Sequence, residues 1–202
     1  MNRTHHEPSS NRNDNGGPAL SGFAPRQSRQ TAETGSLERW DIAPAGSRLG
    51  FVLRHLIVHQ IPGQFRRWGG TIYLDRAQPA LSSVEAWADL ASIDTDSFER
   101  DQHLRSPEFL DVERHPRAEF DSTSLEARDG RLVVRGLLRL HGITRDLELE
   151  IARVDEEENL YEVRGTLDRQ AFGLRWNQDL DVGGVVVGDE IQLTARVKLT
   201  RV

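Results

Sequence analysis

Residues 191–200 read Ile-Gln-Leu-Thr-Ala-Arg-Val-Lys-Leu-Thr, so that an apolar side chain alternates with a polar one at every step. Successive side chains of a β-strand point to opposite faces, and this alternation therefore predicts a strand with one face on a core and the other in water. The same period recurs in 48–55 and in 146–151. We expect a sheet whose strands are each buried on one face.

Other stretches extend this pattern along the chain. Strands are predicted over 63–74, 82–92, 117–126, 131–141 and 160–168. Ala-Arg-Asp-Gly at 127–130 and the acidic run 155–159 read as hairpin loops between them. About eight antiparallel strands in an all-β domain favour a sandwich or a closed barrel. An eight-stranded barrel is either filled by side chains or holds one small ligand, and the period alone does not separate these outcomes.

One region has helical signals. Asp96 with Glu99 resembles a capping box, and Ser106 precedes Pro107 at a second helix start. Two short helical turns are predicted, over 97–104 and 107–111.

The composition of the chain excludes several classes of site and partner. The 202 residues carry a formal net charge of -6 and no cysteine. Disulfide scaffolds, zinc ribbons, iron–sulfur sites and cysteine nucleophiles are therefore excluded. The acidic balance argues against a nucleic-acid partner, which requires a basic face. No apolar run is long enough for a secretory signal or a transmembrane segment.

The first part of the chain differs from the rest. Residues 1–38 are mostly small, polar or charged, and such a stretch cannot bury enough apolar surface to offset the entropy of ordering. We expect a disordered tail at 1–38, including His5 and His6, and a folded domain at 39–202.

The histidines do not form a recognisable metal motif. His55 and His59 have a helical i, i+4 spacing but stand in a predicted strand, where they are about 13 Å apart. His103, His115 and His141 are scattered in the sequence, so no metal site is expected.

Motifs for nucleophilic or acid–base catalysis are also weak. No Gly-x-Ser-x-Gly elbow and no phosphate-binding glycine loop occurs. Asp94 with Asp96 or Asp101 remains open as an acid–base pair, although a helix cap also explains Asp96.

Aromatic residues accompany the predicted strands and helical turns. Phe51, Phe65, Phe120, Phe172 and Trp176 lie in or beside strands, and Phe98 and Phe109 lie on the helical turns. They suit either a packed core or the wall of an apolar tunnel. A tunnel with polar groups at its mouth would hold an amphipathic lipid, whose tail is bound by area burial and whose head is bound by hydrogen bonds.

A series of motifs follows in a characteristic order. These are Trp40-Asp41-Ile42-Ala43-Pro44, Leu49-x-Phe51-x-x-Arg54-His55-Leu56, Gly63-x-Phe65, Ser92-Ile93-Asp94-Thr95, Arg100-Asp101-x-His103-Leu104-Arg105-Ser106-Pro107-Glu108-Phe109, His115-Pro116-x-Ala118-x-Phe120, Gly136-x-Leu138-x-Leu140-His141-Gly142 and Asp168-Arg169-Gln170-Ala171-Phe172-Gly173. Together they resemble the YceI-like family of polyisoprenoid-binding proteins, and the resemblance covers 40–202.

The resemblance implies an eight-stranded, lipocalin-like antiparallel β-barrel with short helical segments closing one end. It also implies non-enzymatic binding of a long isoprenoid or similar amphipathic lipid, of polyprenyl phosphate or quinone type, without a catalytic residue or a further cofactor. The ligand-binding residues expected from it are Phe51, Leu53, His55, Phe65, Phe109, Phe120, Phe172 and Trp176 along the tunnel, with Arg100, Asp101 and His103 at one end holding a polar head or one another.

Two other functions stay open at this point. One is an enzyme acting on a similar amphiphile with His55, Asp101 and His103 as acid or base groups. The other is a filled barrel that serves as a stress-response or interaction module. The resemblance also admits a homodimer. We expect a cytoplasmic location, since no signal peptide is seen, or a periplasmic one if a leader has been removed.

Overall fold

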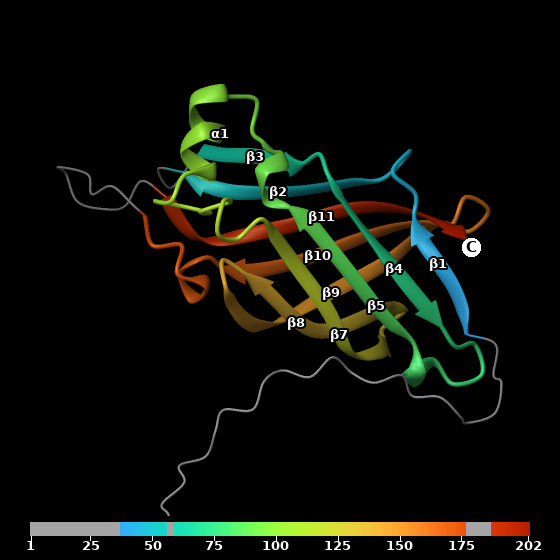
Figure 1. Ribbon diagram of the computed structural model, residues 1–202. Helices are drawn as coiled ribbons and strands as arrows, with labels where there is room; N and C mark the ends of the chain where they lie inside the picture. Colours follow the sequence, from blue (N-terminus) through green and yellow to red (C-terminus); the bar gives the residue numbers. More distant parts are fainter. Residues whose placement is uncertain (1–36, 56–58, 177–186) are drawn as a thin grey trace, which may run out of the picture. The chain divides into compact units, whose positions relative to one another are not determined.

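The computed structural model describes residues 37–55, 59–176 and 187–202 (Figure 1). The chain divides into two units, Met1–Glu33 and Thr34–Val202, and all of the described residues belong to the second. The predicted tail at 1–38 thus lies almost wholly outside the described residues and stays a prediction.

Strands dominate the described part of the chain. They are β1 (Glu38–Ile42), β2 (Arg48–His55), β3 (His59–Phe65), β4 (Trp68–Leu74), β5 (Ser83–Asp89), β6 (Ile93–Asp94), β7 (Arg117–Arg128), β8 (Arg131–Leu140), β9 (Ile143–Asp155), β10 (Leu160–Asp168) and β11 (Val187–Arg201). The helical elements are α1 (Phe98–Arg105) and the short 3₁₀ turns η1 (Pro79–Leu81), η2 (Leu90–Ser92) and η3 (Gln170–Phe172). No helix within these described ranges is long and apolar enough to cross a membrane.

The sheet closes on itself as an antiparallel barrel (Figure 1). Among the described residues, eight strands form the ring in the order β1-β4-β5-β7-β8-β9-β10-β11, and β11 returns to β1 through pairs such as Trp40 with Arg201. The long strand β11 pairs with β1 near its carboxyl end and with β2 nearer its start, so that β2, β3 and β6 extend the same wall. The predicted eight-stranded barrel is confirmed.

The prediction of one continuous strand over 63–74 is wrong. The structure has two strands, β3 and β4, which are interrupted at Arg66 and Arg67. The backbone N–H of Arg66 donates to the Ser92 carbonyl at 3.1 Å, and that of Arg67 donates to Ser92 Oγ at 3.0 Å. These bonds replace strand pairing, and the chain passes from the β2 side of the barrel to the β1 side.

The first predicted helical turn is present, but its cap is not the one expected. The helix α1 begins after Ser97, whose Oγ accepts a hydrogen bond from the Arg100 N–H at 3.5 Å. Asp96, the predicted cap, has φ +59° and lies one residue too early. A serine in extended conformation fills the capping position instead.

The second predicted helix, over 107–111, is wrong. Its residues form consecutive turns, in which the N–H groups of Phe109 and Asp111 both donate to the Ser106 carbonyl, at 3.1 and 2.9 Å. Asp111 has φ +46°, and this left-handed conformation reverses the chain before a helical turn can be extended.

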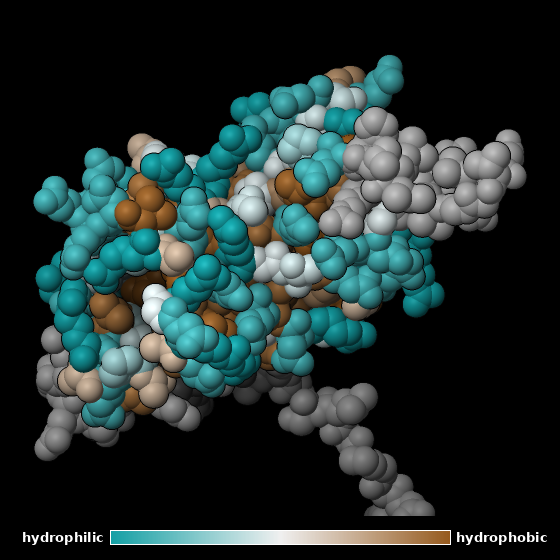
Figure 2. All heavy atoms as spheres, turned by 180° about the vertical axis from the view of Figure 1, so that it is seen from behind, coloured by the Kyte–Doolittle hydropathy of each residue, from teal (hydrophilic) through white to brown (hydrophobic). Residues whose placement is uncertain are grey.

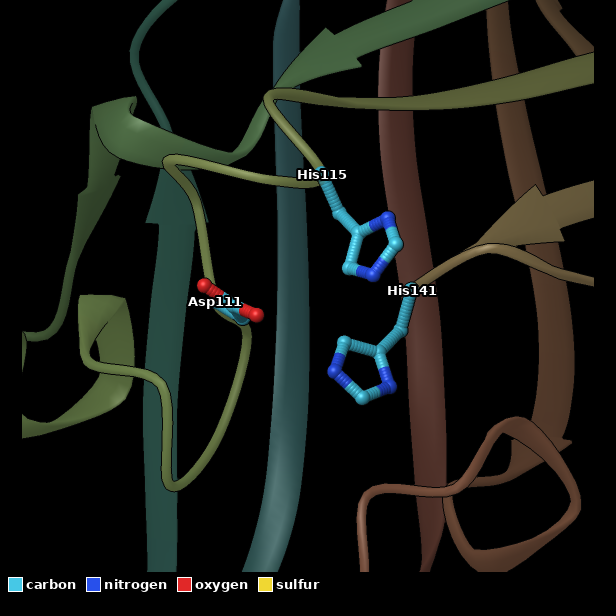
Figure 3. Close-up of side chains that lie close together, drawn as sticks. All are labelled: Asp111, His115 and His141. Atoms are coloured by element: carbon cyan, nitrogen blue, oxygen red, sulfur yellow. The ribbon is translucent and has the colours of Figure 1, made fainter.

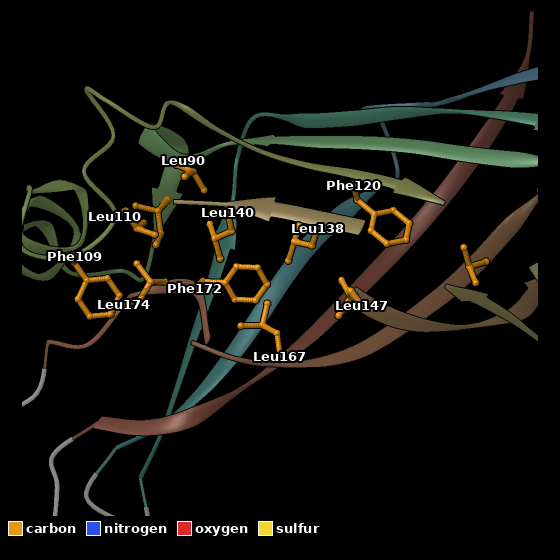
Figure 4. Close-up of a cluster of buried hydrophobic side chains, with 12 residues drawn as sticks. Leu90, Phe109, Leu110, Phe120, Leu138, Leu140, Leu147, Leu167, Phe172 and Leu174 are labelled. Carbon is orange, nitrogen blue, oxygen red and sulfur yellow. The ribbon is translucent and has the colours of Figure 1, made fainter. Parts of the chain in front are cut away.

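A buried apolar cluster lines the barrel interior toward the end that α1 covers (Figure 4). Its members come from η2, β6, the segment after α1, η3 and the adjoining parts of β7 to β10. They are Leu90, Ile93, Phe109, Leu110, Phe120, Val134, Leu138, Leu140, Leu147, Leu167, Phe172 and Leu174. Complete burial of each such side chain contributes about 1.5–3 kcal/mol, so this cluster supplies much of the fold's stability.

Candidate ligand-binding cavity

The inward faces of the strands surround a cavity of about 850 Å³. The alternation that predicted β11 places five of its side chains on the cavity wall: Ile191, Leu193, Ala195, Val197 and Leu199. A volume of this size lies in the upper part of the range usual for small-molecule sites. The barrel is therefore hollow rather than filled by its own side chains.

The cavity is long as well as large. From Ile191 to Leu199 the β11 wall spans about 26 Å of strand at roughly 3.3 Å per residue. A strand tilt of about 40° in such barrels makes this about 20 Å along the barrel axis. The lining is mostly aliphatic and aromatic, with polar side chains near the two ends. An elongated apolar chain matches this shape and chemistry.

Most of the ligand-binding residues expected from the sequence lie on the cavity wall. Those that line it are Phe51, Leu53, Phe65, Arg100, His103, Phe109, Phe120 and Trp176. Their contact with a ligand stays a prediction, but the fold does bring them to one surface.

Three of the expected residues have other outcomes. Phe172 is only 2% exposed and packs in the apolar cluster rather than on the cavity wall. Asp101 is buried away from the wall, where its Oδ1 accepts hydrogen bonds from the Thr95 backbone N–H at 3.0 Å and from Thr95 Oγ1 at 2.6 Å. The side chain of His55 lies outside the described residues, but its backbone pairs with that of His59 on the neighbouring antiparallel strand β3. The expectation that both histidines stand in one strand about 13 Å apart is therefore wrong.

The ring of Phe51 fits its place because its strand partner is a glycine. Phe51 pairs with Gly63, and a Cβ at Gly63 would lie 2.2 Å from Phe51 Cζ. The ring therefore lies over the bare backbone of Gly63, with the Phe65 ring 5.6 Å away. Gly63 thereby keeps the Phe51 ring close to the wall instead of across the cavity.

Polar groups at the α1 end bond mainly within the protein. Arg100 Nε donates to Thr95 Oγ1 at 2.7 Å and its Nη2 donates to the Thr95 carbonyl at 2.5 Å. Asp101 binds the same threonine, so that Thr95 joins α1 to the end of β6. These bonds fix the helix against the barrel.

His103 has partners that the sequence did not indicate. Its Nε2 lies 3.2 Å from Glu108 Oε2, and its ring meets the edge of Trp176 with centroids 4.6 Å apart. The alternative that His103 and Asp101 hold one another is not borne out, because Asp101 is two residues earlier on α1 and bonds to Thr95. His103 instead links α1 to the segment after η3.

A buried arginine secures that segment. Arg169 has no exposed surface, and its guanidinium donates to the carbonyls of Leu174, Trp176 and Gly188. It also forms an ion pair with Asp189 at 3.1 Å. Burial lowers the pKa of Arg169, and the charge of Asp189 opposes that shift. Arg169 thus holds the η3 segment to the start of β11.

The opposite end of the barrel is open and rimmed by charge. Figure 2 shows a hollow lined by hydrophobic residues and surrounded by hydrophilic ones. Arg76, Arg153 and Glu156 border the cavity here, and their side chains are 67%, 54% and 83% exposed. The apolar wall therefore meets water at a charged mouth.

Glu38 organises this mouth. Its Oε1 accepts a hydrogen bond from Arg76 Nε at 3.0 Å, and its Oε2 accepts one from Trp40 Nε1 at 3.2 Å. Arg201 Nη2 lies 3.4 Å from the same carboxylate. The bond from Arg76 holds the pKa of Glu38 below its usual value, and in return it raises the pKa of Arg76. Arg76 is thus a fixed cation beside the mouth.

Two of the histidines that are scattered in the sequence meet in space. The rings of His115 and His141 are 4.8 Å apart between centroids, and Asp111 lies beside them (Figure 3). Two loops that are distant in the sequence meet here. This is the group among the described residues with the donor set of a metal site.

Residues 40–199 match the family model of the YceI-like domain. The chain belongs to the YceI-like family. Protein YceI of Salmonella newport (strain SL254) is 37% identical over 102 residues, which are 50% of this chain and 53% of that protein. The UPF0312 protein plu2095 of Photorhabdus laumondii is 34% identical over 116 residues, or 57% of this chain and 60% of that protein. The matched stretch thus spans little more than half the length of these relatives.

Solved structures show the same YceI-like barrel. Burkholderia cenocepacia BcnA superposes with a TM-score of 0.64 at 21% identity, over 79% of this chain and 99% of BcnA. A polyisoprenoid binding domain from Saccharophagus degradans, implicated in plant cell wall breakdown, gives a TM-score of 0.58 at 16% identity, over 83% and 100% of the two chains. At these identities the likeness establishes the fold.

Sequence reasoning missed the residues that shape the two ends of this YceI-like barrel. Glu38 was assigned to the disordered tail, although it begins β1, and Arg76 lay between two predicted strands with no motif around it. Arg169 was part of a family motif, but its role depends on the carbonyls of Leu174, Trp176 and Gly188. Only the charge of Arg76 beside an apolar strand end could have drawn attention to the mouth.

Proposed function

We propose that this chain binds, without turnover, an amphipathic lipid with an isoprenoid tail in the barrel cavity. The observation that carries the proposal is the continuous cavity of about 850 Å³, which is apolar along its wall and charged at its mouth. Burial of apolar area would hold the tail, and the family and the polyisoprenoid-binding structural neighbour support the same ligand class.

The length of the cavity suggests the length of the tail. An extended chain advances about 1.2 Å per bond, so about 20 Å accommodates about sixteen chain bonds. Each isoprene unit contributes four such bonds to the chain. We therefore propose a tail of about four isoprene units within the barrel, with any longer tail continuing outside.

The mouth suits the polar head better than the α1 end does. Arg100 and Asp101 bond to Thr95, whereas Arg76 uses only Nε in its bond to Glu38. Within the described part of the chain, both Nη groups of Arg76 are left for a ligand, and a guanidinium is well matched to phosphate oxygens. We propose that an anionic head, such as a phosphate, lies at the mouth beside Arg76.

The geometry gives less support to an enzyme. Acid–base catalysis by Asp101 and His103 requires both groups to reach one substrate. Asp101 instead bonds to Thr95 and His103 to Glu108, and only His103 of the two lines the cavity.

The direct test is native mass spectrometry of freshly purified full chain, followed by organic extraction and identification of any released molecule. A stoichiometric polyprenyl or quinone species supports the proposal. If the chain purifies without a ligand, its binding of geranylgeraniol and of geranylgeranyl phosphate is measured instead. Failure of the empty protein to bind either probe would overturn the proposal.

A substitution that fills the cavity tests the location. Ala195 lies on the wall in the middle of β11, and Ala195→Trp places an indole in the path of the tail. We expect loss of at least 90% of the extracted lipid, with the native circular dichroism spectrum kept. Gln192→Trp is the matched control, because it adds the same ring on the exposed face of the same strand. Equal lipid content in the two variants would place the ligand elsewhere.

A further inference from the structure

Three side chains with metal-ligand atoms meet at the α1 end of the barrel, apart from the cavity wall (Figure 3). Asp111 and His115 come from the segment between α1 and β7, and His141 comes from the turn between β8 and β9. One ligand atom of each lies within 4.8 Å of those of the other two. We propose that Asp111, His115 and His141 bind one divalent first-row transition ion.

His141 is held in the tautomer that a metal requires. Its Nδ1 lies 3.2 Å from the Phe172 carbonyl oxygen, which can only accept a hydrogen bond. The proton of a neutral ring is therefore on Nδ1, and Nε2 carries the free lone pair. Metal-binding histidines commonly have this second bond to a backbone carbonyl, because it fixes both the tautomer and the ring direction.

Asp111 supplies a buried negative charge with little compensation. Its side chain is 8% exposed, and its charged partner within the described residues is Arg114, at 3.6 Å, whose side chain is 80% exposed. A buried carboxylate is costly unless it is paired or coordinates a metal. A cation between Asp111 and the two imidazoles would supply that pairing.

The local backbone places His115 beside Asp111. The Asp111 carbonyl accepts hydrogen bonds from the N–H groups of Arg114 and His115, at 3.0 and 2.8 Å, so that a tight turn places His115 next to Asp111. Across the gap, a Cβ at Gly142 would lie 2.8 Å from His115 Cε1. The glycine that follows His141 thus leaves the room in which the His115 ring lies.

The donor set fits zinc and its neighbours. Two imidazoles and one carboxylate suit Zn²⁺, Fe²⁺, Co²⁺ and Ni²⁺, and three protein ligands leave a coordination position for water. Ligand atoms about 2.0 Å from a tetrahedral ion are about 3.3 Å apart, so the groups need to close by about 1.5 Å at most. Rotation of the side chains supplies a movement of that size.

Calorimetric titration of the full chain with Zn²⁺ tests the proposal. The reference protein carries His5→Gln and His6→Gln, so that the adjacent imidazoles of residues 5 and 6 do not add a second site. We expect one ion per chain. We also expect a rise in Tm of about 5–10 °C when free Zn²⁺ is about a hundredfold above Kd. Absence of saturable binding would overturn the proposal.

Variants in the same background locate the ion. His141→Asn keeps an N–H donor for Phe172 and tolerates the φ of +51° at this position, but it removes the Nε2 ligand. His115→Gln removes the second ligand. We expect each to weaken Zn²⁺ binding at least tenfold, and Asp111→Asn to do the same. If both histidine variants bound Zn²⁺ as tightly as the reference protein, the assignment would be contradicted. Two variants are used so that the test still holds if one of them folds poorly.

Two controls separate this site from general effects. Asp129→Asn makes the same change as Asp111→Asn at a residue of similar conformation, φ +51°, in the exposed β7–β8 hairpin. His103→Gln removes an imidazole elsewhere on the α1 end. Both are expected to bind Zn²⁺ as the reference does. Loss of binding in His103→Gln would instead place the ion at His103 and overturn the proposal.

Discussion

The two ends of the barrel are built from the same strands but differ in burial and in exposure to solvent. At the α1 end, Phe172 and Leu174 are each 2% exposed, and Arg169 is completely buried. At the mouth, Leu199 and Trp40 are only partly buried, and they face the cavity beside exposed charges. One end is closed by fully buried side chains behind the cavity wall, and the other is left open.

Because of this difference, stability and ligand binding depend on different parts of the barrel along its axis. Side chains that fill space contribute packing energy to the fold, whereas those that line a cavity leave apolar surface for a ligand to cover. The α1 end also uses its polar groups internally, at Thr95 and Arg169, while the mouth keeps Arg76 toward solvent. The fold is stabilised mainly at one end so that the other end can remain open.

The largest expected effect comes from one substitution made at both ends. Leu174→Ala removes a fully buried side chain, and we expect a loss of about 4 kcal/mol in the free energy of unfolding. Leu199→Ala truncates a side chain that faces the cavity, and we expect about 1 kcal/mol in lipid-free protein. Urea unfolding of both variants measures the gap. Equal losses would mean that the mouth is as tightly packed as the α1 end.

An intermediate effect is expected at the charged rim. Arg76→Gln removes the guanidinium beside the mouth, and we expect the affinity for geranylgeranyl phosphate to fall about tenfold. The affinity for geranylgeraniol, which has no charge, stays within twofold. Arg39→Gln is the control, since Arg39 is an exposed rim arginine that pairs with Asp41 and does not line the cavity. A similar loss for both probes would contradict a headgroup role.

The barrel wall could be predicted from the sequence, because the face of a strand residue is a local property. Every second residue shares a face, so the alternation in 191–200 assigned Leu193 and Ala195 to the inner wall before any pairing was known. The family motifs then added the closed barrel and most of the expected lining. The period fails where pairing stops, as at Arg66 and Arg67 and at the 3₁₀ turn 90–92, which ends the strand predicted over 82–92.

The character of each end could not be predicted, because it depends on loops that meet in space. Phe172 and Phe51 are both aromatic residues in or beside strands, yet Phe172 is buried behind the cavity wall and Phe51 lines the cavity. His115 and His141 looked scattered because two separate loops bring them together. Contacts between loops leave no period in the sequence, so a pattern cannot reveal them.

The smallest effect that we expect is an acid dependence located at the mouth. The hydrogen bond from Arg76 lowers the pKa of Glu38 from its ordinary value of 4.5. A group with a lowered pKa in the folded state stabilises the protein above its unfolded pKa, and this contribution is lost as the pH falls through the folded value. Glu38→Gln removes the titration, so its Tm should fall less than that of the natural sequence between about pH 6 and pH 3.

Asp94 serves as a comparison that shows whether the effect of Glu38 is specific to the mouth. The pKa of Asp94 near α1 is also lowered, chiefly by the hydrogen bond from Gln64, so Asp94→Asn should likewise flatten the dependence of Tm on pH. Of these two carboxylates, however, Glu38 is the one that bonds to Arg76. At neutral pH, Glu38→Gln should therefore change the affinity for geranylgeranyl phosphate by a few-fold, and Asp94→Asn should leave it unchanged. If Asp94→Asn changed that affinity as much as Glu38→Gln did, the phosphate would be held from the α1 end instead of the mouth.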